Sequence, residues 1–420
     1  MSFEWPARPV GELTINHDGR RRPVKESDRR RGPYPYYGAS GIVDSVDGYL
    51  FDGCYLLIGE DGENLRTRQT PIAFLASGKF WVNNHAHIVT GNDLADTRFL
   101  MYALLNADIS AYLTGAVMPK LTQGNLNRIE LPCPPRAVQQ SIVETLSALD
   151  DRIALLRETN VTLETIAQAL FKSWFVDFDP VRAKQQGLPT AGMDEATAAL
   201  FPDGFEDSTL GRVPRGWRTG SILEVADLLS GGTPKTDRSE FWGGNIAWAS
   251  AKDVSQAACS ILVSTERTIT TAGLERSATR LIPRLATVVV ARGATTGRMV
   301  MFGREMAMNQ TCYGLTSKLG APVALYCLLR REIDALVNAA HGSVFDTITT
   351  STFARSIVIQ PPASILARFE EIGRPLFERI AESTTRVQTL ASLRDTLLPR
   401  LISGQLRLPE AAKQITDATT

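Results

Sequence analysis

An internal repeat constrains the fold of this chain more than any other feature of its sequence. A gap-free alignment at an offset of 227 residues (342 minus 115) joins two stretches, GAVMPKLTQGNLNRIELPCPP at 115–135 and GSVFDTITTSTFARSIVIQPP at 342–362. Both copies keep a Gly, a Val, a Thr, an Arg and a terminal Pro-Pro pair. From 115 to 175, fourteen of 61 positions are identical at this offset. A period this long is not that of a solenoid, whose repeats span about 20–50 residues. The chain is therefore predicted to contain two copies of one mixed α/β domain, each followed by a long helix.

The two long helices are predicted from their apolar spacing. From Val138 to Trp174 there is no Pro or Gly, and apolar residues recur at alternating intervals of three and four. Such a narrow seam favours a helix partner, so the two helices are predicted to pair antiparallel. The alternative is that each helix packs only on its own domain. The seam residues are Leu149, Ile153, Leu156, Leu163, Leu170 and Trp174 in the first helix, and Leu376, Ile380, Leu390, Leu397 and Leu401 in the second.

Three local features qualify this prediction. Asn160 lies on the first seam, where a buried Asn fixes register and partner at the expense of stability. Gly373 and Pro375 are expected to kink or interrupt the second helix near its start. The aromatic stretch LFKSWFVDFDP at 170–180 is interpreted as the capped end of the first helix, with Pro180 ending the element.

Charge and composition exclude several classes of protein. The formal net charge is zero, with 45 Lys and Arg against 45 Asp and Glu, which argues against a purely electrostatic nucleic-acid binder. Basic residues are nevertheless gathered: seven of the twelve residues at 20–31 are basic, and 276–304 holds six Arg and no acidic residue. Either run alone is better explained as solvated surface. A chain with such runs can still present its basic residues on one face.

Cysteines and hydropathy bear on the compartment. The five Cys are scattered and form no CxxC pair, which argues against a disulfide framework or a zinc site. No apolar run approaches the roughly 18 residues of a membrane span, and the N-terminus lacks a signal-peptide pattern. A cytoplasmic protein without membrane association is expected.

Sequence signatures of catalysis are absent. There is no GxxxxGK[ST] phosphate loop, no GxGxxG after a strand and no GxSxG, and DFDP lacks the second proline and terminal aromatic of a base-flipping methyltransferase loop. His85 and His87 could offer two imidazoles, but surface or core positions are favoured over a metal site. No catalytic and no metal-binding residue is predicted.

Four segments carry a resemblance to a known family. They are LFKSWFVDFDPVRAK (170–184), LFPDGFEDSTLGRVPRGW (200–217), LSGGTPKTDRSEFWGGNIAWASAKDV (229–254) and LRDTLLPRLISGQLRL (393–408). In these segments the chain resembles the specificity subunit of type I restriction-modification enzymes. The segments are similar, in order, to the central conserved region, the approach to the second target-recognition domain, the opening of that domain and the distal conserved region. The first domain matches least.

The resemblance implies an architecture that agrees with the repeat. The fold class would be α+β, with two tandem target-recognition domains separated by two long antiparallel coiled-coil helices in pseudo-twofold symmetry. The expected boundaries are a first domain at 1–135, a long helix at 136–180, a linker at 181–216, a second domain at 217–362, a second long helix at 363–404 and a tail at 405–420.

The resemblance also implies a role and partners. Each domain would read one half of a bipartite site on double-stranded DNA, while the helices set the spacer and dock two modification subunits through their seam residues. Restriction subunits would join the complex. S-adenosylmethionine, ATP and Mg would be bound by those partners and not by this chain, which would catalyse nothing.

Candidate DNA-contacting residues are the basic, amide and aromatic side chains that suit base edges and phosphates. In the first domain they are Arg20, Arg21, Arg22, Lys25, Arg29, Arg30, Tyr36, Tyr37 and Lys120. In the second they are Lys235, Arg238, Lys252, Arg292, Arg298, Asn309 and Gln310. Two other functions stay open at this point: an interaction scaffold or domain-swapping orphan copy in another defence complex, and a stand-alone nucleic-acid-modifying enzyme.

Overall fold

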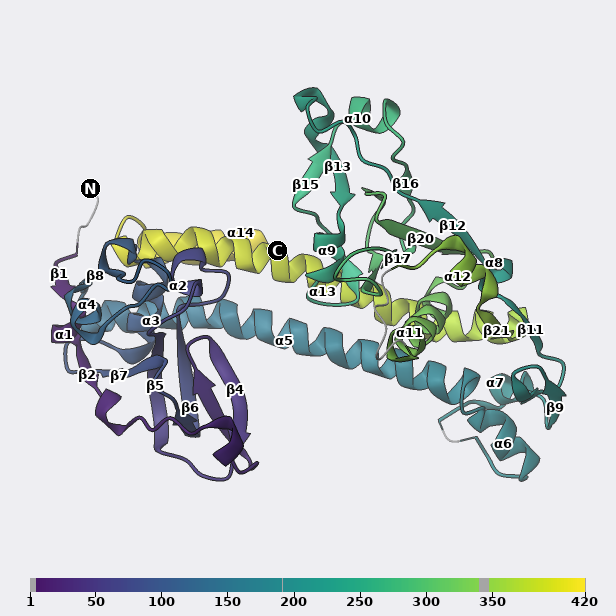
Figure 1. The fold of residues 1–420 in the computed structure, drawn as a ribbon, viewed down its shortest axis with the longest axis horizontal. Coiled ribbons are helices and arrows are strands. Elements are labelled where there is room, and N and C mark those ends of the chain that lie inside the picture. The colour runs from purple at the N-terminus through teal and green to yellow at the C-terminus, as the bar shows by residue number, and fades with distance from the viewer. Residues whose placement is uncertain (1–4, 191, 340–346, 420) are drawn as a thin grey trace. The chain divides into compact units, whose positions relative to one another are not determined.

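The chain divides into two compact units, each mixing helices and strands (Figure 1). The structure is a computed structural model that describes residues 5–190, 192–339 and 347–419. Unit 1 comprises Met1–Ile153 and Thr389–Thr420, and unit 2 comprises Ala154–Gln388. The α+β fold class is confirmed. The first five positions of the second repeat stretch, 342–346, and the start of the first domain, 1–4, lie outside the described residues.

A six-stranded sheet forms the centre of unit 1. Its order is β2-β7-β5-β6-β3-β4, with bounds Thr14–Asn16, Ala86–Gly91, Phe51–Gly59, Ala73–Val82, Tyr34–Gly38 and Gly41–Val46. The long antiparallel pair β5–β6 runs from Phe51 opposite Phe80 to Ile58 opposite Ala73. Helix α3 (Thr97–Asn106) covers this sheet. Asp96 begins the helix by accepting hydrogen bonds from the first backbone N–H groups, as an N-cap should. The short helix α2 spans Asn64–Thr67.

Two sheets form the centre of unit 2. The five-stranded sheet has the order β12-β20-β17-β18-β14, with bounds Ala226–Ser230, Cys312–Ser317, Thr287–Val290, Met299–Phe302 and Ile261–Leu262. The four-stranded sheet has the order β15-β13-β19-β16, with bounds Arg267–Ile269, Trp242–Ala249, Met306–Met308 and Leu281–Ile282. The helices of this region are α9 (Ala251–Ser255), α10 (Thr271–Glu275) and α11 (Pro322–Ala339). Strands β17 and β18 are buried along their whole length, so they form the core of the unit.

The repeat appears in the structure as two equivalent frames. In unit 1, β1 (Ala7–Pro9) pairs antiparallel with β8 (Glu130–Pro132). In unit 2, β11 (Arg218–Ser221) pairs in the same way with β21 (Ile357–Gln360). A short helix follows the first strand of each pair: α1 (Val10–Leu13) and α8 (Ile222–Val225).

Repeated residues hold equivalent places in these frames. Thr122 is the N-cap of α4 (Gln123–Arg128), and Thr349, its partner at the 227 offset, is the N-cap of α12 (Thr350–Arg355). Each hydroxyl accepts the N–H three residues on, which is why a Thr is needed at both places. Arg128 and Arg355, which also align at the 227 offset, are the last residues of α4 and α12. The duplication is therefore structural as well as sequential.

The long helices pair antiparallel in unit 2, and they also meet in unit 1, where Arg394 donates to Asp150 at 2.7 Å. Helix α5 spans Arg136–Phe175 and α13 spans Ala363–Ser403. Within unit 2, Asn160 donates to the Thr384 hydroxyl at 3.2 Å, and further along α5 the Phe171 ring meets the earlier Phe369 of α13. The partner number falls as the α5 number rises, as antiparallel helices require. The side chain of Asn160 is 3 % exposed, so its predicted place on the buried seam is confirmed.

Most of the predicted seam is buried. Buried members are Leu149, Ile153, Leu156, Trp174, Ile380, Leu390, Leu397 and Leu401. Leu163, Leu170 and Leu376 are only partly buried and pack at the edge of a larger cluster. Next to Leu376, Phe377 is fully buried and contacts Tyr326 of α11. Around Leu376 the buried face of α13 is therefore wider than the predicted seam, because α13 also packs against α11.

The expected interruption of the second helix is wrong. Helix α13 continues through Gly373, Pro375 and Pro399. Gly373 lies at a close contact, where a Cβ would stand 3.1 Å from a Val323 methyl group and 3.3 Å from the Phe369 ring. Tertiary packing therefore holds the helix together where the local sequence disfavours it.

The expectation for Pro180 is also wrong. Helix α5 does end at Phe175, but Phe178 adopts a left-handed backbone conformation (φ 57°), and Pro180 lies in the first turn of a new helix, α6 (Asp179–Gln185). Proline is favoured there because its missing N–H has no partner in a first helical turn. The predicted linker at 181–216 is also structured, with α7 (Glu195–Ala199), β9 (Phe205–Ser208) and β10 (Gly211–Pro214).

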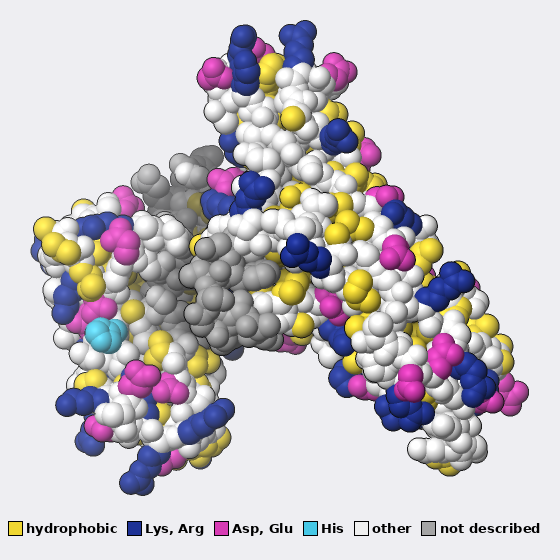
Figure 2. Space-filling model, turned by 45° about the vertical axis from the view of Figure 1, so that its right-hand side comes forward, with side chains coloured by type: hydrophobic (Ala, Val, Ile, Leu, Met, Phe, Trp, Pro, Cys, Tyr) yellow, Lys and Arg dark blue, Asp and Glu magenta, His cyan; other side chains and the backbone are white. Residues whose placement is uncertain are grey.

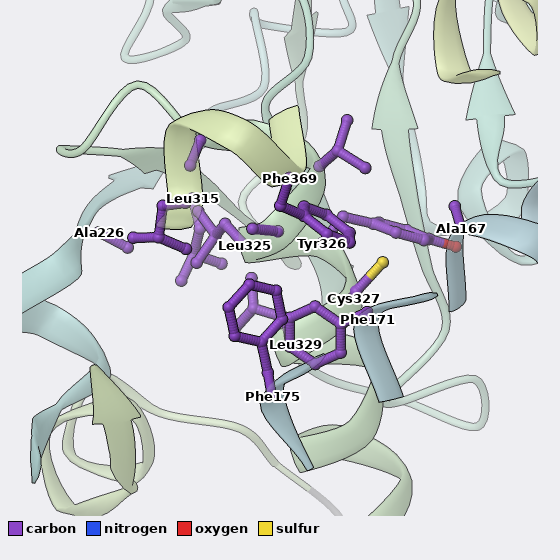
Figure 3. Close-up of a cluster of buried hydrophobic side chains, with 14 of the residues drawn as sticks. Ala167, Phe171, Phe175, Ala226, Leu315, Leu325, Tyr326, Cys327, Leu329 and Phe369 are labelled. Carbon is purple, nitrogen blue, oxygen red and sulfur yellow. The ribbon is translucent and has the colours of Figure 1, made fainter. Parts of the chain in front are cut away.

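The aromatic stretch packs into the main core of unit 2. Figure 3 shows Phe171 and Phe175 of α5 pointing toward Leu325, Leu329 and neighbouring residues of α11. Phe369 is fully buried, with its ring centroid 5.3 Å from that of Phe175.

The last helix of the described residues is α14 (Leu408–Thr419). Among the described residues, no helix is both long and apolar enough to cross a membrane.

Candidate nucleic-acid interface

A glycine-containing loop carries the predicted basic residues at the start of the second domain. It connects β12 to β13 and includes Lys235 and Arg238, both exposed. Its glycines lie against backbone: a Cβ on Gly231 would stand 2.0 Å from the Asn309 carbonyl oxygen, and one on Gly232 would stand 2.4 Å from the Thr279 nitrogen. Only glycine, which has no Cβ, can lie so close to neighbouring backbone atoms. These two contacts therefore fix the position of the loop on the sheet.

Two tryptophans hold this loop by hydrogen bonds. The Trp248 indole donates to the Gly232 carbonyl at 2.9 Å, and the Trp242 indole donates to the Lys235 carbonyl at 3.1 Å. Both rings come from β13. The loop is thus anchored to the four-stranded sheet on either side of its central residues.

We expect Gly231→Ala to destabilise unit 2 by about 1–3 kcal/mol, the usual range when a group is forced into a packed site. The Asn309 carbonyl is backbone and cannot turn aside. Thermal denaturation of the variant should show the loss. Gly19→Ala is the control, since a Cβ there meets nothing within 4 Å; equal melting temperatures for the two variants would contradict the packing argument.

The structure brings some of the second-domain candidates together. The Thr233 hydroxyl of the loop hydrogen-bonds to the Gln310 side chain, so Gln310 and its neighbour Asn309 lie beside the loop. Lys252 lies on α9 and pairs with Glu266 at 2.7 Å. Figure 2 shows Lys and Arg side chains, with acidic ones among them, at the end of unit 2 that carries α10, β13 and β15.

Arg292 and Arg298 come from a different loop of the second domain. Both are exposed, in the turn between β17 and β18. Arg298 lines a separate hollow, together with Arg330 and Asp334 of α11. Arg292 follows Ala291, whose N–H donates to the Thr311 carbonyl at 2.8 Å, so it lies near the Asn309–Gln310 segment, whereas Arg298 faces the hollow beside α11.

In the first domain the basic run forms a loop held on the sheet by its own arginines. Arg20 donates to the Leu50 carbonyl and lies 4.6 Å from the Phe51 ring centroid. Arg29 donates to Asp44 at 3.1 Å and lies 4.6 Å from the Tyr36 ring centroid. These contacts fix the loop, whereas the side chains of Arg22, Lys25 and Arg30 are exposed.

Two predicted DNA contacts are bonded to other groups of the protein instead. Tyr36 is 1 % exposed and its hydroxyl accepts the Val24 N–H at 3.0 Å, so it supports the loop from beneath. Arg21 is 15 % exposed and its guanidinium is occupied by Glu60 at 2.7 Å, Asp18 at 3.3 Å and the Ala86 carbonyl at 2.7 Å. The Tyr36 hydroxyl and most of the N–H groups of Arg21 are thus bonded within the protein. Tyr37 is half-buried and packs on Phe74 and Phe80.

Arg21 belongs to a charged network beneath the loop. His87 is 1 % exposed, with Nδ1 at 2.6 Å from Asp18 Oδ2 and Nε2 at 2.7 Å from the Leu121 carbonyl. Each ring nitrogen of His87 therefore lies within hydrogen-bond distance of an oxygen of the protein. Lys120 extends the network to the surface, 3.3 Å from Glu60.

The network controls the acidity of its two carboxyl groups. Burial raises the pKa of Asp18, but hydrogen bonds from His87 and the Ile88 N–H outweigh it, so the pKa lies below its usual range. Burial likewise raises the pKa of Glu60, but Arg21, His87 and Lys120 together hold it below its usual range. Both carboxylates are therefore ionised near neutral pH.

The two histidines of the HAH motif have separate roles. His85 is exposed and pairs with Asp61 at 2.8 Å, whereas His87 is buried in the network. Within the described part of the chain, no group of three or more His, Cys, Asp or Glu is arranged to hold a metal ion.

Comparison with known proteins connects this duplicated fold to a family. The family model for the type I restriction modification DNA specificity domain matches residues 4–165 and again 214–378. The two matches together cover well over half of the chain. This chain is a member of the type I restriction-modification DNA specificity family. Its two matches contain the two frames described above, one in each unit, so the family's specificity domain is present in two tandem copies.

Similar proteins agree with this membership. The HindI specificity subunit of Haemophilus influenzae is 27 % identical over 84 % of this chain and 84 % of that protein. The MjaIX specificity subunit of Methanocaldococcus jannaschii is 26 % identical over 85 % of this chain and 80 % of that protein. The crystal structure of a type I restriction-modification S subunit from M. genitalium has the same fold, with a TM-score of 0.62 at 15 % identity over 95 % of this chain and 96 % of that chain.

Members of the specificity family are generally non-catalytic, bind DNA and work within complexes. The restriction-modification family therefore accounts for the absence of catalytic signatures in the sequence. One residue beside the loop was missed: Arg267, whose guanidinium carbon lies 3.5 Å from the Trp242 ring centroid. Nothing in its local sequence marks it, because its neighbours come from another strand.

Proposed function

We propose that this chain is the DNA-reading subunit of a type I restriction-modification complex, and that each of its two domains reads one half of a bipartite site. The observation that carries the proposal is the duplication: two matches to one DNA specificity family, each with the same strand frame and the same Thr-capped helix. Two copies of a reading domain that differ at their surfaces suit a site with two different halves.

The long helices suit the remaining parts of this role. In our proposal α5 and α13 set the length of the unread spacer and dock two modification subunits. Restriction subunits complete the assembly, which acts on cytoplasmic DNA. S-adenosylmethionine, ATP and Mg are held by those partners, and the methyltransferase, translocase and nuclease activities reside there. The family match disfavours a scaffold in another defence complex.

The basic surface fits a reading domain better than a general DNA-binding one. With a net charge of zero, affinity has to come from residues gathered locally, and the loops at Lys235 and Arg22 supply them. Phosphate contacts hold a protein in register, and base-edge contacts supply specificity.

Replacing residues 1–135 with the first domain of another family member is expected to change one half of the methylated site and leave the other half unaltered. Each unit has its own core, so each should keep its own specificity. The measurement is methylome sequencing of a host that expresses the chimaera with its modification subunit. The reciprocal exchange of 217–362 is the matched control. A change in both halves from a single exchange would contradict modular reading, and a wild-type complex without sequence preference would contradict the proposed function.

A further inference from the structure

Arg267 lies on an aromatic shelf made by two tryptophans of the adjacent strand. Its guanidinium carbon is 3.5 Å from the Trp242 ring centroid and 5.8 Å from that of Trp248. The two indoles meet edge to face, with centroids 5.1 Å apart and ring planes 87° apart. The guanidinium of Arg267 is therefore held against an aromatic face, where cation–π attraction and stacking favour it.

The backbone of β13 explains why the two rings meet Arg267 together. Trp248 stands directly opposite Arg267 in the antiparallel register, so the two side chains share one face of the sheet. A bulge between Trp242 and Ile246 then shifts the register and brings Trp242 to the same place. Glycine is required in this bulge, since Gly243 has φ +78° and a Cβ on Gly244 would lie 2.5 Å from the Ile269 carbonyl oxygen.

The shelf is joined to the basic loop. The same two indoles that support Arg267 donate their N–H groups to the Gly232 and Lys235 carbonyls. Loop, tryptophans and Arg267 therefore form one connected structure. A shift of the Trp242 ring would move both the Lys235 segment and the Arg267 guanidinium.

Arg267 is exposed and not neutralised. Among the described residues, no carboxylate lies within ion-pair distance of its guanidinium, and the adjacent Glu266 is paired with Lys252 instead. Arg21 and Arg29 of the first domain differ in this respect, because their guanidinium groups are paired with carboxylates. The strand thus presents an ordered, uncompensated cation at the surface.

We propose that Arg267 reads a guanine in the half-site of the second domain, and that Trp242 is its positioning residue. This inference rests on the proposed function. A guanidinium whose plane is fixed by stacking can present two parallel N–H donors to the O6 and N7 acceptors of guanine in the major groove. A phosphate could be bound by a freely rotating cation and would need no such shelf.

The test measures binding of the complex, assembled with its modification subunits, to DNA duplexes that carry each single base-pair change in the site. The variants are Arg267→Ala, Arg267→Lys and Trp242→Leu. Arg304→Ala is the control, because Arg304 is an exposed arginine of the same unit that lines a hollow beside α13, away from the shelf. Melting temperatures and co-purification with the modification subunits report whether each variant folds.

Arg267→Ala and Arg267→Lys should both lose about 10- to 100-fold of discrimination at one G·C pair of the second half-site, because a lysine keeps the charge but not the fork. Trp242→Leu should lose part of the discrimination at the same pair, and Arg304→Ala should retain it. If Arg267→Ala does not fold, Arg267→Lys decides the matter.

Two results would overturn the inference. One is an equal loss of affinity on every sequence together with a shallower salt dependence, which indicates a phosphate contact. The other is unchanged discrimination in Arg267→Ala and Arg267→Lys. In both cases the wild-type complex would still read its site, whereas failure of the proposed function would show as a wild-type complex without any sequence preference.

Discussion

Replacing Phe369 with alanine is expected to lower the free energy of unfolding of unit 2 by about 3–5 kcal/mol, the range for removing a fully buried Phe. The Phe369 ring is 0 % exposed. It meets Phe175 at 5.3 Å and both Phe171 and Trp174 at 5.9 Å between ring centroids. Each edge-to-face pair adds about 0.5–1.5 kcal/mol beyond the buried area, so several favourable contacts disappear together.

The position of Phe369 in the fold increases this effect. Its ring also lies 3.3 Å from the place where a Cβ of Gly373 would stand, and that glycine admits Val323 at the start of α11. Removing the ring therefore leaves a cavity where α5, α11 and α13 meet. Rigid helices on three sides collapse poorly, so the loss should fall in the upper part of the range.

The measurement is thermal or urea denaturation of the purified chain. For a unit of this size, each kcal/mol shifts the melting temperature by about 2–4 °C. Ile372→Ala is the control, because Ile372 lies on the same helix but is 36 % exposed; it should change stability far less. Equal losses in Phe369→Ala and Ile372→Ala would show that the aromatic cluster is not the centre of the core.

The parts of the fold that the sequence predicts well are those with local causes. Thr122 and Thr349 cap helices through hydroxyl groups three residues from their donors, so the repeat could be recognised without any tertiary information. The helix pairing follows from a periodic seam, and Asn160 takes its predicted place on it. Period and capping depend on near neighbours in the chain, and the sequence contains these directly.

The parts that the sequence predicts poorly depend on distant neighbours. Pro375 disfavours a helix locally, but α13 is held by packing against other elements and continues through it. The basic run at 20–31 predicts exposed side chains. Arg21, however, is partly buried and paired with Glu60, which lies 39 residues away in the sequence. Arg267 has no local mark, because its shelf is built by residues of the neighbouring strand. Whether a basic side chain is free to contact DNA therefore depends on bonding partners that are distant in the sequence.

Replacing Asp18 with alanine is expected to destabilise unit 1 by about 3–5 kcal/mol, the loss that follows when one partner of a buried ion pair is removed. The Asp18 carboxylate is 7 % exposed and accepts from His87 at 2.6 Å and from the Ile88 N–H at 2.8 Å. Without it, the Arg21 guanidinium loses one of its two carboxylate partners, and His87 Nδ1 and the Ile88 N–H lose the oxygens they contact.

Two variants separate the charge from the hydrogen bonds. Asp18→Asn keeps an oxygen that can accept from the Ile88 N–H but removes the negative charge, so its loss should lie between that of alanine and zero. Asp61→Ala is the control: it removes a carboxylate from the other histidine pair, whose His85 side chain is 53 % exposed, and a surface pair contributes about 0–1 kcal/mol. Chemical denaturation at neutral pH compares the three.

The pH dependence of the same unit gives an independent measurement. The pKa values of Asp18 and Glu60 lie below their usual range in the folded state, so the folded chain binds fewer protons than the unfolded chain in acid. Their contribution to stability is complete above the ordinary carboxyl pKa values and is lost as the pH falls through the lowered ones. The stability of unit 1 should therefore fall as the solution is acidified below about pH 5, and Asp18→Ala should fall less steeply because one of the two groups is gone. Identical slopes for the variant and the wild type would mean that the Asp18 carboxylate is not held ionised by this network. The stability loss in Asp18→Ala would then come from the lost hydrogen bond to the Ile88 N–H.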